Sequence, residues 1–169
     1  GTEMGACRAA RRSRRRHKGG TMNCTNGKTA LQNASNWMDA AARCDLEAIT
    51  DGMAESCKRF GEPNWMVMDK SNYIAGYTQY LTSFSDYRLD ILNVMSSGSS
   101  VVFEMIESAI FSAPYPLADG RIIKPSGQRY ADRVCTWVEV GRDGLITEIR
   151  AYIPSTRGAM MAEAIAEMG

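Results

Sequence analysis

The stretch VVFEMIESAIF, at residues 101–111, is the most informative segment of the chain. Its β-branched and aromatic residues are typical of a β-strand, in which successive side chains point to opposite faces. This alternation places Phe103, Met105, Glu107, Ala109 and Phe111 on one face, and Glu104 on the other with Val102, Ile106, Ser108 and Ile110. Neither face is cleanly polar. We therefore expect one face to pack on helices or a partner and the other to line a cavity.

The segments around this strand predict further strands after it and helices before it. Strand-like composition recurs at residues 87–95, 129–140 and 145–153, with turn residues at 97–99 and 142–144. Helical spacing begins at Thr25 and continues to residue 42, a short helix follows Asp45 through residue 53, and Asp69 or Ser71 caps a third helix. A short strand is expected at residues 65–68 and a final helix at 160–168. This order predicts an α+β fold in which a curved antiparallel sheet wraps around the N-terminal helices.

The 169 residues correspond to one domain with a tail. Residues 1–18 carry seven Lys or Arg and one acidic residue, although the net charge of the whole chain is only +1. Such a segment buries too little apolar surface to fold, so we expect residues 1–21 to form a disordered basic tail and residues 22–169 a single domain. Two interpretations of the tail remain: an arm that binds nucleic acid weakly, or an extension upstream of a natural start at Met22.

Composition excludes several classes of function. No apolar run is long enough to span a membrane, so no membrane association is expected. The five cysteines form no Cys-x-x-Cys pair, which fits a reducing, cytoplasmic environment and predicts no metal site. The sole histidine, His17, lies in the basic tail, so histidine-based catalysis in a folded pocket is excluded. Glycine-rich phosphate loops are absent, and we expect no cofactor.

Glu107 is the first candidate for chemistry because it interrupts an otherwise apolar stripe. A carboxylate that is removed from water can accept and donate a proton near neutral pH. Asp132 is the second candidate, since alternation places it on the same strand face as Val134, Thr136 and Val138. The alternative for Glu107 is a structural ion pair with Arg133 or Arg150, and for Asp132 a salt bridge at the end of its strand.

Four motifs resemble one known family. They are WMDAAARCDLEAI at residues 37–49, SDYR at 85–88, SGQR at 126–129 and DGLITEIRAY at 143–152. Their order is similar to that in the SnoaL-like branch of the nuclear-transport-factor-like superfamily, which includes polyketide cyclases, ketosteroid isomerase and limonene epoxide hydrolase. The resemblance covers about residues 28–154 and implies a cone-shaped α+β barrel. Because this fold hosts both enzymes and inert modules, the resemblance alone fixes no reaction.

The comparison with limonene epoxide hydrolase implies that Glu107 keeps a catalytic carboxylate. Met105 stands where that enzyme has an arginine, and Ala151 where it has its second aspartate. The acid–base aspartate of the polyketide cyclases would fall near Thr136. The chain thus departs from both catalytic sets, and hydrolysis by the two-carboxylate relay is not expected.

Two functions follow from these observations. The first is an enzyme that performs cofactor-independent acid–base chemistry (isomerisation, cyclisation, dehydration or hydrolysis) on a hydrophobic small molecule, with Glu107 and Asp132 as catalytic groups. The second is a non-catalytic dimeric module that binds a ligand or a protein. The apolar residues on both faces of the 101–111 strand predict a homodimer through the outer face of the sheet. The residues expected to contact the ligand are Trp37, Trp65, Tyr73, Tyr77, Phe103, Met105, Thr136 and Arg150.

Overall fold

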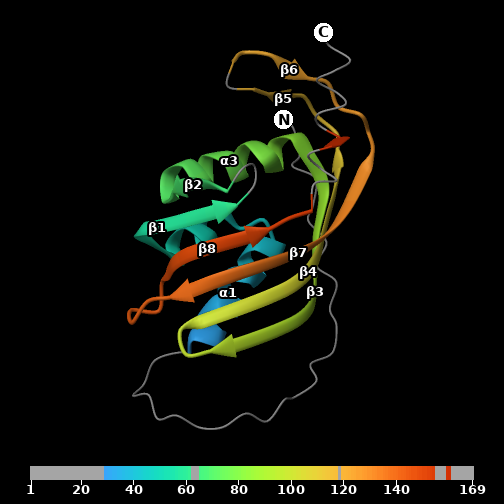
Figure 1. Cartoon of the computed structure of the whole chain (residues 1–169). Coiled ribbons are helices and arrows are strands. Elements are labelled where there is room, and N and C mark those ends of the chain that lie inside the picture. Colours follow the sequence, from blue (N-terminus) through green and yellow to red (C-terminus); the bar gives the residue numbers. More distant parts are fainter. Residues whose placement is uncertain (1–28, 62–64, 118, 155–158, 161–169) are drawn as a thin grey trace.

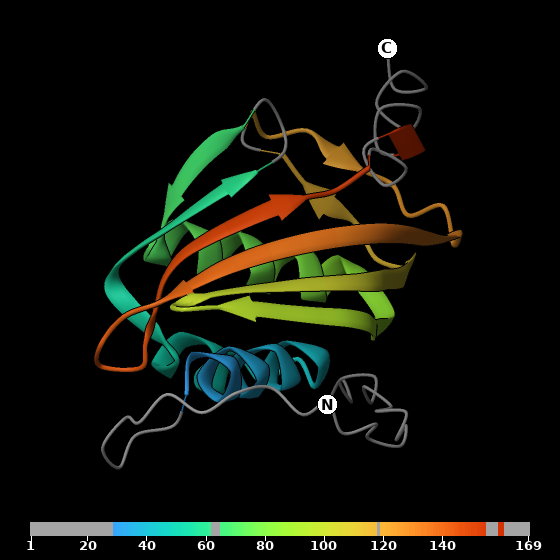
Figure 2. The same ribbon diagram turned by 60° about the horizontal axis from the view of Figure 1, so that its bottom comes forward.

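The computed structural model describes residues 29–61, 65–117, 119–154 and 159–160, with helices packed on one side of a strongly curved sheet (Figures 1 and 2). In chain order the elements are α1 (Ala30–Ala42), α2 (Leu46–Asp51), β1 (Met53–Gly61), β2 (Met66–Asp69), α3 (Lys70–Ser83), β3 (Phe84–Ser97), β4 (Ser100–Phe111), β5 (Tyr115–Pro116), β6 (Ile122–Ile123), β7 (Arg129–Val140) and β8 (Ile146–Tyr152). The expected tail at residues 1–21 lies outside the described residues, as does nearly all of the helix expected at 160–168.

The main sheet has six strands in the order β2-β1-β8-β7-β4-β3. Neighbouring strands are antiparallel except β1 and β8, which run parallel. Helix α3 contacts both edge strands, β2 and β3, so the sheet curls far enough for one helix to bridge its edges (Figure 1). The predicted α+β class and wrapped sheet are therefore confirmed, with one parallel pair that the sequence analysis did not anticipate.

The helices begin at side chains that accept backbone hydrogen bonds. Asp45 accepts one from the N–H of Ala48 at 3.1 Å, and Asp69 accepts one from Asn72 at 2.9 Å, so both predicted N-caps are confirmed. Helix α1 is capped by Thr29, later than the predicted Thr25 or Asn26. Within the described residues, no helix is both long and apolar enough to cross a membrane.

Strand β1 is the main departure from the sequence prediction. The helix expected to run through Met53 ends at Asp51, and β1 begins at Met53. Its exposed residues are polar, among them Glu55 and Lys58, so the sequence shows no clear apolar alternation. The strand forms because β2 and β8 supply hydrogen-bonding partners on its two sides. Tertiary pairing therefore overrides a weak local preference.

The core lies between α1 and the concave face of the sheet. Strand β4 alternates as predicted, with Phe103 and Phe111 fully buried, and β7 buries Val134 and Val138 on the same side. A second, mostly aromatic cluster joins the C-terminal end of α3 to the beginning of β3 and β7. The two clusters leave space between them under α3.

Glycine substitutions test how this space and the turns are built. Gly76 lies in α3, and a Cβ atom there would meet nothing within 4 Å. We expect Gly76→Ala to raise the free energy of unfolding by about 0.5–1 kcal/mol, because alanine loses less backbone entropy in a helix.

Gly144→Ala should lower the free energy of unfolding by about 1–3 kcal/mol. Gly144 has a φ of +85°, and its Cβ would lie 2.7 Å from Nδ2 of Asn33. Urea unfolding measures both, and a destabilised Gly76→Ala protein would contradict the helix geometry.

Candidate functional site

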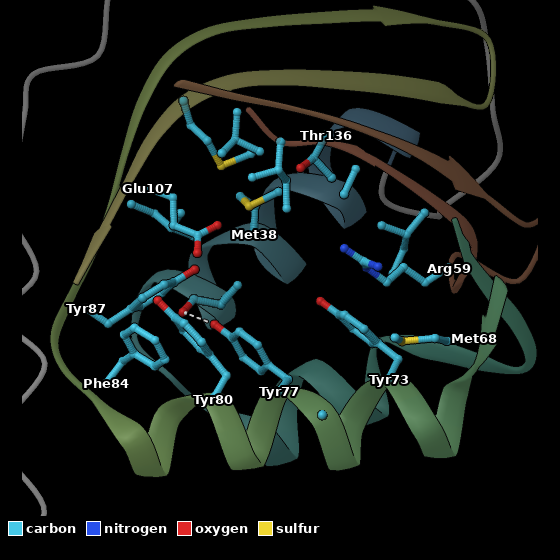
Figure 3. Close-up of a pocket in the computed structure, with 18 of the residues that line it drawn as sticks. Met38, Arg59, Met68, Tyr73, Tyr77, Tyr80, Phe84, Tyr87, Glu107 and Thr136 are labelled. Atoms are coloured by element: carbon cyan, nitrogen blue, oxygen red, sulfur yellow. Dashed lines mark hydrogen bonds between the residues drawn. The ribbon is translucent and has the colours of Figure 1, made fainter. Parts of the chain in front are cut away.

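A cavity of about 380 Å³ lies between α3 and the concave face of the sheet (Figure 3). Its volume falls in the range of small-molecule sites. Its walls are mainly aromatic and aliphatic, with a few polar side chains. The lining residues are Trp37, Met38, Ala41, Arg59, Met66, Met68, Tyr73, Gly76, Tyr77, Tyr80, Phe84, Tyr87, Leu89, Met105, Glu107, Tyr115, Val134, Thr136, Ile149, Ala151 and Ile153.

Glu107 enters this cavity from β4. Strand alternation puts it on the concave face, as the sequence predicted, and it is half-buried. The hydroxyl of Tyr130 donates a hydrogen bond to Glu107 Oε1 at 2.7 Å, and the hydroxyl of Tyr80 is in turn hydrogen-bonded to that of Tyr130. A carboxylate held in this way has a fixed orientation toward the cavity. This position suits a group that exchanges a proton with a bound ligand.

Asp132 lies directly across from Glu107 on the neighbouring strand β7. Its side chain is on the interior face and only 2% exposed, so the predicted orientation of this residue is correct. Asp132 is not among the described residues that line the cavity. It therefore sits in the wall beside Glu107, behind the residues that would contact a ligand.

Tyrosines from α3 and β3 form one side of the cavity. Tyr73 and Tyr77 stack with ring centroids 6.1 Å apart, and Tyr77 and Tyr80 at 6.2 Å, because positions three and four apart share a helix face. Tyr77 donates to the backbone oxygen of Ala41 at 3.3 Å (dashed in Figure 3), and Tyr87 is hydrogen-bonded to Tyr77.

The hydroxyls of this wall stay protonated at neutral pH. Burial raises the pKa of Tyr73 to about 12 and holds the pKa values of Tyr77 and Tyr87 well above the ordinary tyrosine range. The negative charge of Glu107 contributes further in the same direction. Each phenol therefore keeps its proton, and the protons of Tyr77 and Tyr87 are used in hydrogen bonds within the protein.

Arg59 is a cavity residue that the sequence analysis missed. It comes from β1, and its guanidinium carbon lies 5.9 Å from the ring centroid of Tyr73. Since β1 itself was not predicted, nothing in the local pattern indicated which way Arg59 points. Tyr87, Phe84 and Met38 were also missed as lining residues.

The predicted ligand contacts divide into two groups. Trp37, Tyr73, Tyr77, Met105 and Thr136 line the cavity. Three others do not belong to its described lining. Phe103 is fully buried in the core, Trp65 is 44% exposed and packs on Tyr152, and Arg150 faces the convex side of the sheet, where it lies 5.7 Å over Trp137. Strand alternation explains why Arg150 faces outward, because its neighbours Ile149 and Ala151 are the residues of β8 that face inward.

The structure also bears on the structural alternative for Glu107. Arg133 pairs with Glu104 on the outer face at 3.3 Å, and Arg150 pairs with Glu148. Neither arginine faces the cavity, so the two ion pairs considered for Glu107 do not form. Within the described residues, no three His, Cys, Asp or Glu side chains gather into a metal-binding group, and Cys44, Cys57 and Cys135 form no disulfide bond.

Replacing Tyr130 tests the contact that holds Glu107. Tyr130→Phe removes a buried hydroxyl that is shared by Tyr80 and Glu107, so we expect the free energy of unfolding to fall by about 1–3 kcal/mol. Tyr152→Phe, at a position that is 47% exposed, is the matched control and should change it by less than about 0.5 kcal/mol. Urea titration of both variants gives the comparison, and equal effects would mean that the hydrogen bond to Glu107 is not formed in solution.

A family model described as "SnoaL-like domain" matches residues 34–149. The chain belongs to the SnoaL-like domain family. The resemblance noted in the sequence is thereby confirmed, and the match runs from within α1 to within β8. No curated protein matches the sequence.

Solved structures agree on the fold. A candidate SnoaL-like polyketide cyclase from Jannaschia sp. CCS1 is 16% identical with a TM-score of 0.67, covering 84% of this chain and 96% of that one. AclR from Streptomyces galilaeus, a candidate hydroxylase, is also 16% identical, with a TM-score of 0.66 and coverage of 79% and 96%. A hypothetical protein from Catenulispora acidiphila with a ketosteroid isomerase-like fold, in complex with trimethylamine, is 13% identical with a TM-score of 0.57 and coverage of 74% and 86%. Because proteins with such different described activities share one fold, the reaction of this protein must be argued from its site.

Proposed function

We propose that this SnoaL-like domain is an enzyme that performs cofactor-independent acid–base chemistry on a hydrophobic, carbonyl-bearing small molecule. The observation that supports this proposal is Glu107, a carboxylate that Tyr130 orients into a cavity with mostly aromatic and aliphatic walls. Glu107 would take a proton from a carbon next to the carbonyl. The electron pair of that C–H bond moves onto the carbonyl oxygen, and protonated Glu107 returns the proton at the same or another carbon.

The protonated tyrosines would complete this chemistry. Tyr87 points into the same end of the cavity as Glu107 (Figure 3). By turning its O–H from Tyr77 toward the reacting carbonyl, this neutral phenol would stabilise the negative charge that develops on the carbonyl oxygen. Isomerisation, aldol-type cyclisation and dehydration all begin with such a proton transfer, so the proposal covers these reactions as one class.

Solvent deuterium exchange tests the proposal without knowledge of the natural substrate. Hydrophobic ketones that bind the protein are incubated with it in D₂O, and NMR follows the hydrogens next to the carbonyl. We expect exchange well above the buffer rate for at least one bound ketone, and its loss in Glu107→Gln. Ketones that bind without any exchange would contradict the proposal and favour the second function, a non-catalytic module.

We propose in addition that the protein forms a homodimer through the convex face of the sheet. Met95 of β3 is 68% exposed, and it lines a shallow groove on this face with Val102 and Cys135. Exposed apolar surface of this kind is typical of an interface. Analytical ultracentrifugation at micromolar concentration should show a dimer, and Met95→Lys should weaken it. Ile122→Lys, at an exposed position of β6, is the control. A wild-type monomer would exclude the dimer.

A further inference from the structure

The cavity has opposite charges at its two ends. Glu107 and Arg59 project into it from different strands and face each other across the cavity (Figure 3). Arg59 is opposite Ile149 in the register of β1 and β8, and Ile149 is itself a lining residue. The side chain of Arg59 therefore belongs to the concave face. Its half-buried position strengthens its electrostatic interaction with any ligand charge, since water screens it less.

The guanidinium of Arg59 is held along the cavity wall. Gly61 follows two residues later on the same face of β1, and a Cβ atom there would lie 3.1 Å from one guanidinium nitrogen and 3.2 Å from its central carbon. The ring of Tyr73 lies on another side of the group, at 5.9 Å. The absence of a side chain at Gly61 thus leaves room for the planar cation beside the cavity rather than in the solvent.

The spacing of the strands sets the length of a ligand that reaches both ends. Strands β8 and β7 separate β1 from β4. Three inter-strand spacings correspond to about 14 Å between the two backbones, less the reach of the two side chains. The nearly parallel rings of Tyr73 and Tyr77, whose planes differ by 17°, line the cavity between the two ends. The aromatic rings along the cavity suit a ligand with a conjugated, apolar body.

We infer that the ligand of this cavity is a flat, conjugated molecule with an anionic oxygen, which docks on Arg59 and leaves the proton-exchanging end at Glu107. This inference rests on the proposed function and names its substrate class. Arginine binds carboxylate and other oxyanions through a planar fork of donors. The carboxylate of Glu107 repels an anionic group, so the charge pattern favours the orientation in which the anion lies at Arg59. If an enolate forms near Glu107, the conjugated ligand would also delocalise its negative charge toward Arg59.

Matched aromatic probes test the inference on the full chain. Isothermal titration calorimetry compares 2-naphthoate with the neutral 2-naphthamide and the cationic 2-naphthylmethylammonium. We expect 2-naphthoate to bind the wild-type protein at least tenfold more tightly than the amide, and the ammonium to bind most weakly. Equal affinities for the acid and the amide would overturn the inference, and this comparison needs no variant.

Variants then locate the preference. Arg59→Gln should remove the tenfold preference while the affinity for 2-naphthamide stays within about twofold, and Arg59→Lys should retain part of it. Arg133→Gln, which removes a cation from the outer face, should leave the preference intact. A preference that survives Arg59→Gln would overturn the inference. Deuterium exchange that depends on Glu107 but lacks any anion preference would refute only this substrate class, whereas anion binding without exchange would refute only the proposed reaction.

Discussion

Glu107→Gln is expected to reduce the rate of proton exchange by about a hundredfold or more while ligand binding persists. The amide has nearly the shape of the carboxylate and still accepts the hydrogen bond from Tyr130, which is 2.7 Å long in the structure. The amide cannot take up a proton near neutral pH, so the step that defines general base catalysis is lost. The measurement is the NMR exchange rate at saturating ketone, together with the dissociation constant of the same ketone.

Glu104→Gln is the matched control for this experiment. Glu104 is on the same strand but faces the convex side, where it accepts a hydrogen bond from Asn93 at 2.6 Å and pairs with Arg133. An exposed ion pair contributes little, so we expect a change in rate of less than about twofold and almost no change in stability. If both variants exchange at the wild-type rate, Glu107 is not the base and the binding module becomes the leading function.

The sequence was sufficient for the parts of the fold that carry a strong local pattern. The alternation in residues 101–111 predicted the inward face of β4, and the cap candidates Asp45 and Asp69 or Ser71 predicted where α2 and α3 begin, with Asp69 as the actual cap of α3. Strand β1 escaped prediction because its outer residues are polar and one of its two partner strands, β8, lies about ninety residues away. The parallel pairing of β1 with β8 is likewise a tertiary property that no local pattern encodes.

The same limit applies to the site. Parity along β4 and helical spacing along α3 placed Glu107, Tyr73 and Tyr77 correctly in the cavity wall. Arg59 was missed with β1, and Arg150 was assigned to the wrong face because its strand is inward-facing at the residues on either side of it. Residue type alone cannot separate a cavity residue from a core residue, since both are apolar or aromatic. Phe103 shows this ambiguity most clearly.

Phe103→Ala is expected to lower the free energy of unfolding by about 3–5 kcal/mol, which is a large part of the stability of a domain of this size. Phe103 has no exposed surface and is among the largest fully buried side chains. It packs in the main core with Trp37, Val101 and Val138. The substitution loses the transfer free energy of the ring and leaves a void that the surrounding side chains fill only in part. Urea unfolding followed by circular dichroism measures the change.

Trp65→Ala is the matched control, because Trp65 is also a large aromatic residue that the sequence placed at the ligand. It is 44% exposed and contacts Tyr152 at a ring distance of 5.1 Å, so we expect a loss of only about 1 kcal/mol. Phe103→Leu provides a milder change, since leucine retains most of the buried volume and should cost about 1–2 kcal/mol. If the Phe103→Ala protein keeps wild-type stability and loses only ligand affinity, Phe103 contacts the ligand, as the sequence predicted, and is not a core residue. We instead expect Phe103→Ala to destabilise the protein far more than Phe103→Leu or Trp65→Ala. This order follows because the Phe103 side chain supports the site by holding β4 in place behind Glu107.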